Sequence, residues 1–310
     1  MRFNHSHAPS RDAKRECRPA PRLSSQAVRR PLDDEILVGD NLPLLAEFAD
    51  ESFQLVYIDP PFNTGKTQTR LRLQTLPDDS GDRTGFGGRR YRSELLDRSS
   101  YRDDFDDYLG FLEPRLLQAR RLLNRTGTLY FHVDYREAHY CKLLLDEIFG
   151  RDCFLNEIIW AYDYGARTRR RWPAKHDTIL VYVKDFRDYY FDSDEVDREP
   201  YMAPGLVTAE KAARGKLPTD VWWHTIVPTS GAEKTGYATQ KPEAIVRRMV
   251  LASTRPGDWC LDFFAGSGTL GAVATKLGRR YVLIDWSPDA VAIMRERLAI
   301  AAHETAAEAS

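Results

Sequence analysis

Residues 262–269 read DFFAGSGT, and this stretch separates a short apolar strand from a helix. We expect the strand over Trp259–Asp262 and the helix over Thr269–Leu277. A glycine turn between a strand and a helix lets the backbone approach a ligand closely, because no Cβ intervenes. Asp285 ends the next strand, 19 residues after Gly266, where a carboxylate can accept hydrogen bonds from both hydroxyls of a ribose.

The amino-acid sequence of this turn limits which classes of ligand it can bind. No GK[ST] sequence is present, which argues against a nucleoside triphosphate. We expect an adenosyl ligand without a pyrophosphate. The alternative is a close-packed strand–helix turn that binds no ligand.

Outward from the turn, predicted strands alternate with predicted helices, which indicates a doubly wound, mostly parallel α/β sheet. The helices are expected over 42–49, 105–123 with a kink or break at Pro114, 136–149 and 288–300. The other strands are expected over Glu35–Asp40, Phe53–Asp59, Thr128–Val133, Phe154–Trp160, His176–Lys184 and Tyr281–Asp285.

Composition changes divide the chain around one α/β domain over residues 32–300. Residues 1–31 and 301–310 are predicted to be disordered tails. Residues 64–104 are polar and too long for a simple connection, so they are predicted to form a functional, mobile loop. Residues 186–235 interrupt the α/β pattern and are interpreted as an insertion.

Bulk properties exclude several classes of protein. The net charge of −1 is no general signature for nucleic acid, so contact with nucleic acid must depend on local basic patches. Cys17, Cys141, Cys153 and Cys260 show no CxxC spacing, which argues against a zinc site or a disulfide framework. The chain has no apolar run of about 18 residues and no secretory signal, so we expect a cytoplasmic protein without a membrane span.

A second motif, YIDPPFNTG over residues 57–65, ends another strand. Pro60 and Pro61 remove backbone donors and fix φ, so they end the strand and stiffen the chain beyond it. Asp59 and Phe62 are then held on a rigid elbow. The stretch presents an acceptor, a carbonyl edge and a ring face to something flat.

DFFAGSGT, YIDPPFNTG and the sequence Thr239–Pro242 together resemble the S-adenosylmethionine-dependent DNA amino-methyltransferases of the β arrangement. The nearest likeness is to the modification subunits of type III restriction systems, because of YIDPPFNTG, NEIIW and TGYATQKP. The resemblance spans most of residues 35–300 and makes residues 32–300 a circularly permuted, Rossmann-like methyltransferase domain. In the family's numbering of strands by position in the sheet, the strand before the cofactor turn is the first. Here this strand comes late in the chain, and Ile36–Asp40 corresponds to the third strand.

The resemblance implies site residues. The catalytic group is Asp59, Pro60, Pro61 and Phe62, which hold an extrahelical base for transfer of a methyl group to its exocyclic amine. The cofactor S-adenosylmethionine is expected to contact Asp40, Thr239, Gln240, Lys241, Pro242, Asp262, Phe263, Phe264, Ala265, Gly266, Ser267, Gly268, Thr269 and Asp285. Two alternatives stay open: Asp40 as the cap of the following helix, and Thr239–Pro242 as a plain helix start.

Contact with double-stranded DNA is expected at the basic run Arg167, Arg169, Arg170 and Arg171. Arg89, Arg90 and Arg92 in the predicted 64–104 loop form a second candidate, and 186–235 is the expected target-recognition segment. The alternative for each basic run is a solvated surface. A second copy of the chain or a restriction-system partner is an open partner, whereas no membrane or metal partner is expected.

The sequence therefore predicts a cytoplasmic, nucleoid-associated DNA (adenine-N6)-methyltransferase. The acid at position 59 favours adenine, since N4-cytosine members of the family more often carry Ser there. Cytosine-N4 methylation and RNA as the substrate stay open. A third alternative is a catalytically silent, methyltransferase-like subunit that binds nucleic acid.

Overall fold

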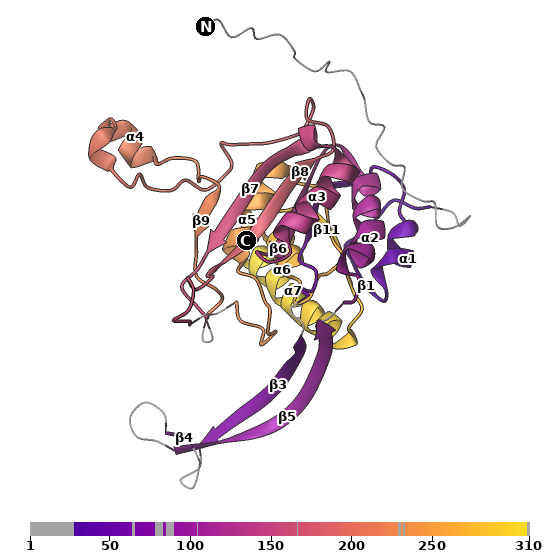
Figure 1. Ribbon diagram of the computed structural model, residues 1–310, viewed down its shortest axis with the longest axis vertical. Coiled ribbons are helices and arrows are strands. Elements are labelled where there is room, and N and C mark those ends of the chain that lie inside the picture. The colour runs from indigo at the N-terminus through magenta and orange to yellow at the C-terminus, as the bar shows by residue number, and fades with distance from the viewer. Residues whose placement is uncertain are drawn as a thin grey trace, which may run out of the picture.

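The computed structural model describes residues 28–63, 66–77, 83–84, 90–103, 105–165, 167–228, 231 and 233–308. An eight-stranded sheet forms its centre, in the order β1-β11-β10-β2-β6-β8-β7-β9 (Figure 1). Neighbours are parallel except where β8 meets β6 and β7. The strands are β1 (Glu35–Val38), β11 (Arg280–Asp285), β10 (Trp259–Asp262), β2 (Phe53–Ile58), β6 (Leu123–Asp134), β8 (His176–Val183), β7 (Phe154–Ala161) and β9 (Val221–Trp223).

Helices cover both faces of this sheet, which confirms the predicted doubly wound fold (Figure 1). One layer holds α1 (Asn41–Ala46), α2 (Tyr108–Leu122) and α3 (Ala138–Phe149), and the other holds α5 (Glu243–Ser253), α6 (Thr269–Lys276) and α7 (Pro288–Glu308). Strand β2 is fully buried between the layers. Val56 and Ile58 pack into the first core, and Leu55 and Tyr57 into the second, because successive side chains of a strand point to opposite faces.

The strand order confirms the predicted permutation. β10 pairs with β11 on one side and with β2 on the other, and β1 pairs with β11. The strand that is third in the family's sheet numbering, β1, is thus the first described strand in the chain. Because these strands are parallel, their carboxyl ends meet at one edge of the sheet, where ligands bind in open α/β folds.

Several predicted boundaries were wrong. Residues 301–308 continue helix α7 instead of forming a disordered tail. Of the predicted tail 1–31, Arg29 joins the fold through an ion pair with Glu35 and a bridge to Phe48, and residues 1–27 lie outside the described part. Helix α2 runs unbroken through Pro114, so the chain does not break there.

The predicted 64–104 loop contains regular structure. β3 (Lys66–Pro77) and β5 (Arg90–Asp103) pair in antiparallel fashion, and β4 (Arg83–Thr84) pairs with β5. These strands form a sheet of their own, which projects from the eight-stranded sheet in Figure 1. The expectation of a loop was therefore wrong for these strands, because the segment is polar over most of its length and a long polar connection is typical of a loop.

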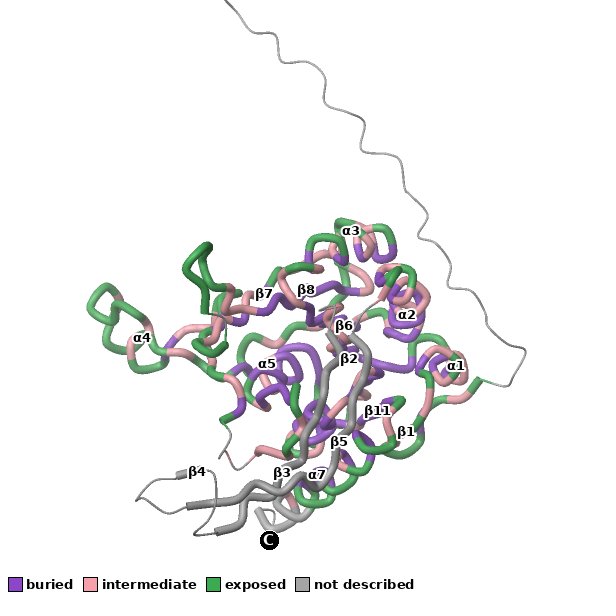
Figure 2. Tube along the Cα trace, turned by 60° about the horizontal axis from the view of Figure 1, so that its bottom comes forward, coloured by how far each residue is buried: buried purple, intermediate pink, exposed green. Residues whose placement is uncertain are grey.

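The predicted insertion 186–235 holds a 3₁₀ helix over Pro204–Leu206, helix α4 (Ala209–Arg214) and strand β9. Helix α4 buries none of its residues, and Figure 2 shows exposed residues around it. Strand β9 pairs with β7 and thereby anchors the segment to the edge of the main sheet. The purple buried residues of Figure 2 follow the central strands and the helix faces turned toward them.

Candidate active site

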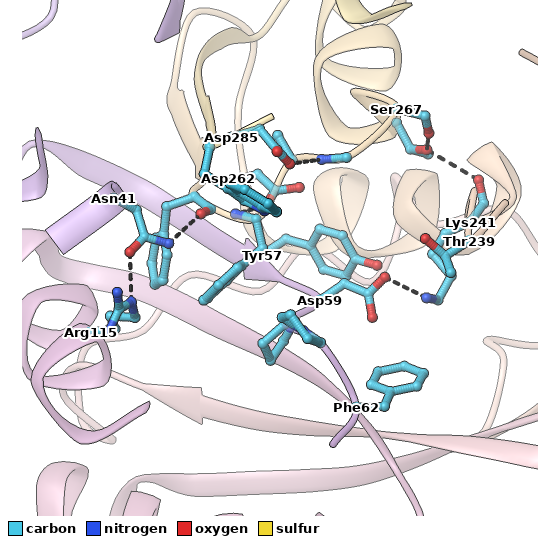
Figure 3. A pocket seen from close by; sticks show the side chains of 18 of the residues that line it. Asn41, Tyr57, Asp59, Phe62, Arg115, Thr239, Lys241, Asp262, Ser267 and Asp285 are labelled. Atoms are coloured by element: carbon cyan, nitrogen blue, oxygen red, sulfur yellow. Dashed lines mark hydrogen bonds and ion pairs between the residues drawn. The ribbon is translucent and has the colours of Figure 1, made fainter. Parts of the chain in front are cut away.

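A cavity of about 570 Å³ opens at the carboxyl ends of β1, β11, β10 and β2 (Figure 3). All four predicted catalytic residues, Asp59 to Phe62, line it. Of the residues predicted to contact the cofactor, these line it as well: Asp40, Thr239, Lys241, Asp262, Phe263, Phe264, Ala265, Gly266, Ser267, Thr269 and Asp285. Two motifs that lie about 200 residues apart in the chain thus meet because their strands are neighbours.

Asp59 follows the last residue of β2, and the two prolines after it end the strand. Its side chain is only 16% exposed. Oδ2 accepts a hydrogen bond from the ammonium of Lys241, whereas Oδ1 is buried and has no hydrogen-bond partner among the described residues. A buried oxygen without a partner is unfavourable, so a ligand that donated a hydrogen bond to this oxygen would relieve the cost.

Lys241 connects the two motifs. Its side chain is 10% exposed, and its Nζ lies 4.9 Å from the centroid of the Phe62 ring, within the range of a cation–π contact. The backbone oxygen of Lys241 accepts from Oγ1 of Thr269 at 3.2 Å, on the first residue of α6. The Lys241 ammonium therefore lies beside Asp59 and Phe62, while the Lys241 backbone is hydrogen-bonded to Thr269, directly after the glycine turn (Figure 3).

Behind this motif lies a buried polar chain that sequence analysis missed. The Tyr57 hydroxyl lies 3.1 Å from Nδ1 of His132, whose Nε2 lies 3.2 Å from Oδ2 of Asp177. Tyr162 donates to Oδ1 of Asp177 at 3.0 Å. The ring of His132 also lies 5.9 Å from that of Phe62. The sequence signal that could have revealed this network is His132 itself, a polar residue within the apolar strand predicted over Thr128–Val133.

The protonation of these buried side chains favours one pattern of hydrogen bonds among them. Burial raises the pKa of the Tyr57 hydroxyl well above its ordinary value, so Tyr57 keeps its proton. Burial opposes ionisation of Asp177, but the hydrogen bond from His132 and the charge of Lys241 hold the pKa of this carboxyl below its ordinary value. An imidazole that donates from Nε2 to Asp177 accepts at Nδ1 from Tyr57, so one tautomer satisfies both contacts.

The glycine turn connects β10 to α6 through backbone conformations that favour glycine. Gly266 has φ 52° and Gly268 has φ 73°. A Cβ on Gly266 would lie 3.1 Å from the ring of Tyr237, which also lines the cavity. The Gly266 amide donates to Oδ2 of Asp285 at 2.8 Å, and the Ser287 amide donates to Oδ1 at 2.9 Å. The predicted ribose acid is thus fixed by two backbone amides at the cavity wall.

Asp262 lies deeper in the wall and is 2% exposed. Its Oδ1 accepts from the Phe264 amide at 3.0 Å. Burial raises the pKa of the Asp262 carboxyl well above its ordinary value, and the charges of Asp59 and Asp285 act in the same direction. Burial also raises the pKa of Asp285. The wall of the cavity therefore holds two carboxyl groups, Asp262 and Asp285, whose ionisation is disfavoured by burial.

Comparison with known proteins identifies this arrangement. A model of the N6/N4 methyltransferase family, described as DNA methylase, matches residues 53–296. The chain belongs to this family. It is an S-adenosylmethionine-dependent DNA amino-methyltransferase, as the motifs predicted.

Two curated relatives support the assignment of this chain to the family. The DNA adenine methyltransferase YhdJ of Escherichia coli K12 is 28% identical over 281 residues, which cover 88% of this chain and 85% of the relative. The Type II methyltransferase M.HpaI of Haemophilus parainfluenzae is 28% identical over 267 residues, covering 86% and 74%. Neither name refers to a type III system, so that predicted likeness stays a prediction.

Two solved structures share the fold. The methylase aligns with the M1.HpyAVI–SAM complex at a TM-score of 0.55 and 20% identity, covering 85% of this chain and 98% of the other. It aligns with the cytosine-N4-specific PvuII DNA methyltransferase at a TM-score of 0.59 and 16% identity, covering 89% and 93%. At these identities the likeness concerns the fold.

In the methylase, the end of β1 contributes a polar cluster. Oδ1 of Asp40 accepts from the Leu42 amide at 3.1 Å, so Asp40 is the N-cap of α1, which was the alternative left open. It also lines the cavity and pairs with Arg115 at 2.9 Å. Arg115 donates to Asn41, and Asn41 donates to the Phe263 carbonyl at 2.7 Å. Asn41 and Arg115 lacked a local sequence motif and were missed.

Three residues predicted to contact the cofactor are absent from the lining of this cavity. Gln240 donates to the Glu233 carbonyl at 2.6 Å and accepts from Thr235, so it shapes the loop before α5. Pro242 is the N-cap residue of α5, which confirms the helix start. Gly268 is the N-cap of α6, where a Cβ would lie 2.8 Å from Met294. Direct contact of these three with the cofactor stays a prediction.

The predicted DNA contacts lie at a different place on the methylase. Arg167, Arg169, Arg170 and Arg171 are exposed, and Trp172 beside them is 94% exposed. Arg167 and Arg171 line a second cavity of about 550 Å³, which shares Thr239 and Lys241 with the first. Arg89 lies outside the described residues, and Arg90 and Arg92 belong to β5.

The described residues contain no group of three or more His, Cys, Asp or Glu side chains that could hold a metal ion. No helix within the described part of the chain is long and apolar enough to cross a membrane.

Proposed function

We propose that this methylase transfers a methyl group from S-adenosylmethionine to the N6 amine of adenine in double-stranded DNA. The observation that carries the proposal is the geometry of Asp59. One of its oxygens is buried and without a partner among the described residues, and its other oxygen meets a cation that stands over the ring of Phe62. An exocyclic amine would donate a hydrogen bond to an oxygen of Asp59, and the flat ring that carries the amine would stack on Phe62.

The chemistry follows from the weakness of the nucleophile. The lone pair of an exocyclic amine is delocalised into the base, so the nitrogen attacks poorly. Acceptors at Asp59 and at the carbonyl of Pro60 would take hydrogen bonds from its two hydrogens and favour a pyramidal, more nucleophilic nitrogen. Phe62 would supply a stacking face that offsets the loss of stacking in the duplex. The prolines hold these groups in place before the base arrives.

The first cavity fits an adenosyl cofactor. Its volume of about 570 Å³ is that of a typical small-molecule site. Each oxygen of Asp285 accepts one backbone amide, and a carboxylate oxygen has a further lone pair for a ribose hydroxyl. Gly266 and Asp262 line the same cavity. When bound there, S-adenosylmethionine supplies an electrophilic methyl group.

The DNA would lie across the second cavity and the basic run. Arg167 and Arg171 stand on its rim beside the aromatic side chains of Tyr162 and Tyr164, a combination suited to phosphate and base contacts. Because this cavity meets the first at Lys241, an extruded base can reach Asp59 from the DNA side. The segment 186–235, anchored by β9, is the proposed target-recognition segment.

The choice of adenine depends on the acid at position 59 and is supported by the relative named a DNA adenine methyltransferase. The cytosine-N4-specific enzyme with the same fold supplies the competing choice. Analysis of methylated nucleosides in digested product DNA separates them. N6-methyladenine is the expected product, and N4-methylcytosine would keep the mechanism and change the base.

The test of the mechanism is Asp59→Ala. We expect labelled-methyl transfer to unmethylated duplex DNA to fall about 10²–10³-fold at saturating cofactor, the usual loss for a preorganised acceptor. Binding of S-adenosylmethionine, measured by calorimetry, should persist. Activity within about tenfold of the parent would remove Asp59 from the catalytic group.

A matched control is Asp33→Ala, which removes an acid whose side chain is 93% exposed and precedes β1 at the opposite edge of the sheet. It should leave methyl transfer unchanged. If calorimetry detects no binding of S-adenosylmethionine to the parent, the chain is a silent subunit instead.

A further inference from the structure

Asn63, which follows Phe62 in the motif YIDPPFNTG, has a backbone conformation that few side chains adopt. Its φ is 53°, and Glu51 is the only other non-glycine residue with positive φ in the described part of the chain. Such a conformation costs free energy in an L-residue, although asparagine tolerates it better than most. It persists only where the surrounding contacts hold it, and such strain gathers at functional sites.

Those contacts come from the side-chain amide of Asn63. Its Oδ1 accepts from the Phe105 amide at 3.0 Å, and its Nδ2 donates to Oε1 of Glu137 at 3.1 Å. Phe105 lies just after β5, and Asn63 lies just before β3. This hydrogen bond therefore joins the two segments that connect the β3–β5 sheet to the rest of the chain, and we call these segments the root of that sheet. Glu137 is the N-cap residue of α3 and follows β6. One amide thus joins three segments next to the catalytic motif.

The same contacts fix the neighbouring wall of the cavity. The ring of Phe105 lies 4.7 Å from that of Phe111, which lies 6.1 Å from Phe264 in the glycine turn. Phe62 is covalently attached to Asn63, and its ring lies 5.9 Å from the buried His132. A shift at Asn63 would therefore move the proposed stacking face relative to the cofactor cavity.

We propose that Asn63 is a positioning residue for methyl transfer: its amide holds Phe62 and Asp59 in register with α3 and with the root of the β3–β5 sheet. The inference rests on the proposed function and adds to it a residue that touches neither the base nor the cofactor. A misplacement of about 1 Å can cost around 10²-fold in rate, so the effect belongs in turnover.

The experiment uses four variants of the full chain. Asn63→Gly keeps the left-handed backbone accessible and removes both side-chain bonds. Asn63→Asp keeps the acceptor for Phe105 but sets a carboxylate against Glu137. Glu137→Gln alone keeps an oxygen that can accept from Asn63. The double variant Asn63→Asp/Glu137→Gln restores the second bond with donor and acceptor exchanged.

We expect Asn63→Gly and Asn63→Asp to lower kcat for methyl transfer about 10–100-fold, because they release the motif. The KM for S-adenosylmethionine should stay near that of the parent, since Asn63 does not line the cavity. Glu137→Gln should stay near the parent as well. The double variant should recover most of the activity that Asn63→Asp loses, which a general loss of stability would not allow.

A parent that binds S-adenosylmethionine but methylates no DNA would overturn the proposed function, and this inference with it. An active parent with Asn63→Gly at full kcat would overturn the inference alone. If Asn63→Gly fails to fold, the comparison of Asn63→Asp with the double variant decides. Failure of the folded double variant to regain activity would then refute the positioning role.

Discussion

The two halves of the proposed site differ in how their polar groups are held. In the cofactor half, Asp262 and Asp285 are 2% and 7% exposed, and backbone amides contact their carboxylates. In the DNA half, Arg169 to Arg171 and Trp172 extend into solvent. A small ligand of fixed shape is matched by fixed dipoles, whereas a long polyanion is matched by exposed cations that gain from released counterions.

Asp59 and Lys241 lie where these halves meet. Lys241 lines both cavities and pairs with Asp59, so the boundary is an ion pair whose members are 10% and 16% exposed. If the two halves bind their ligands independently, a substitution in the cofactor half should leave DNA binding unchanged. A substitution in the DNA half should likewise leave binding of S-adenosylmethionine unchanged.

The largest effect on binding is expected from Asp285→Ala in the cofactor half. Loss of a charge-assisted hydrogen bond should weaken S-adenosylmethionine by roughly 1.5–3 kcal/mol. Calorimetric titration measures this affinity. The salt dependence of DNA binding should not change, because Asp285 lies at the end of β11, away from the basic run. Unchanged cofactor affinity would show that the ribose contact is misplaced.

The reciprocal change replaces Arg169, Arg170 and Arg171 with Ala. If all three contact phosphates, the slope of log K against log salt should become shallower by about 2.7, at roughly 0.9 per contact. Fluorescence anisotropy of labelled duplex DNA across a salt series measures it. Cofactor affinity should stay constant.

Arg295→Ala, on an exposed position of α7, is the matched control for charge alone. Its slope should equal that of the parent. If the triple variant also keeps the parent slope, the basic run is a solvated surface and the DNA path lies elsewhere.

A third test uses the buried acid. Because burial raises the pKa of Asp262, the folded state keeps a proton that the unfolded state loses. Stability should therefore fall as pH rises from the unfolded carboxyl range toward the raised folded value, by up to about 1.4 kcal/mol per pH unit. Asp262→Asn does not titrate and should remove this part of the slope in urea denaturation. An identical pH dependence in parent and variant would mean that Asp262 is ionised in the fold.

The smallest effect is expected from Asp40→Ala at the rim of the cofactor half. Asp40 caps α1 while its side chain is 61% exposed, so the variant should lose about 1 kcal/mol of stability. Cofactor affinity should change by less than it does in Asp285→Ala. A larger loss of affinity than of stability would instead assign Asp40 to the adenine edge.

Local patterns predicted much of the fold. The apolar strands and the periodic helices were found within a few residues, because burial between two helix layers leaves a direct mark on composition. The polar β3–β5 sheet and the continuation of α7 to Glu308 were missed. The first is polar over most of its length, and the second begins as a normal helix and carries no stop signal at residue 300.

The catalytic motif and the glycine turn were visible in the sequence because backbone requirements demand particular residues, namely proline to end a strand and glycine for positive φ. Their supporting contacts were not visible. Arg115 with Asn41, His132 with Tyr57 and Asn63 with Phe105 lie 74, 75 and 42 residues apart, and their partners carry no local signature. By itself the sequence determined the fold class and the chemistry offered at the two strand ends. Only the tertiary structure decided which polar groups hold that chemistry in place, because hydrogen bonds between distant segments depend on how the strands lie side by side.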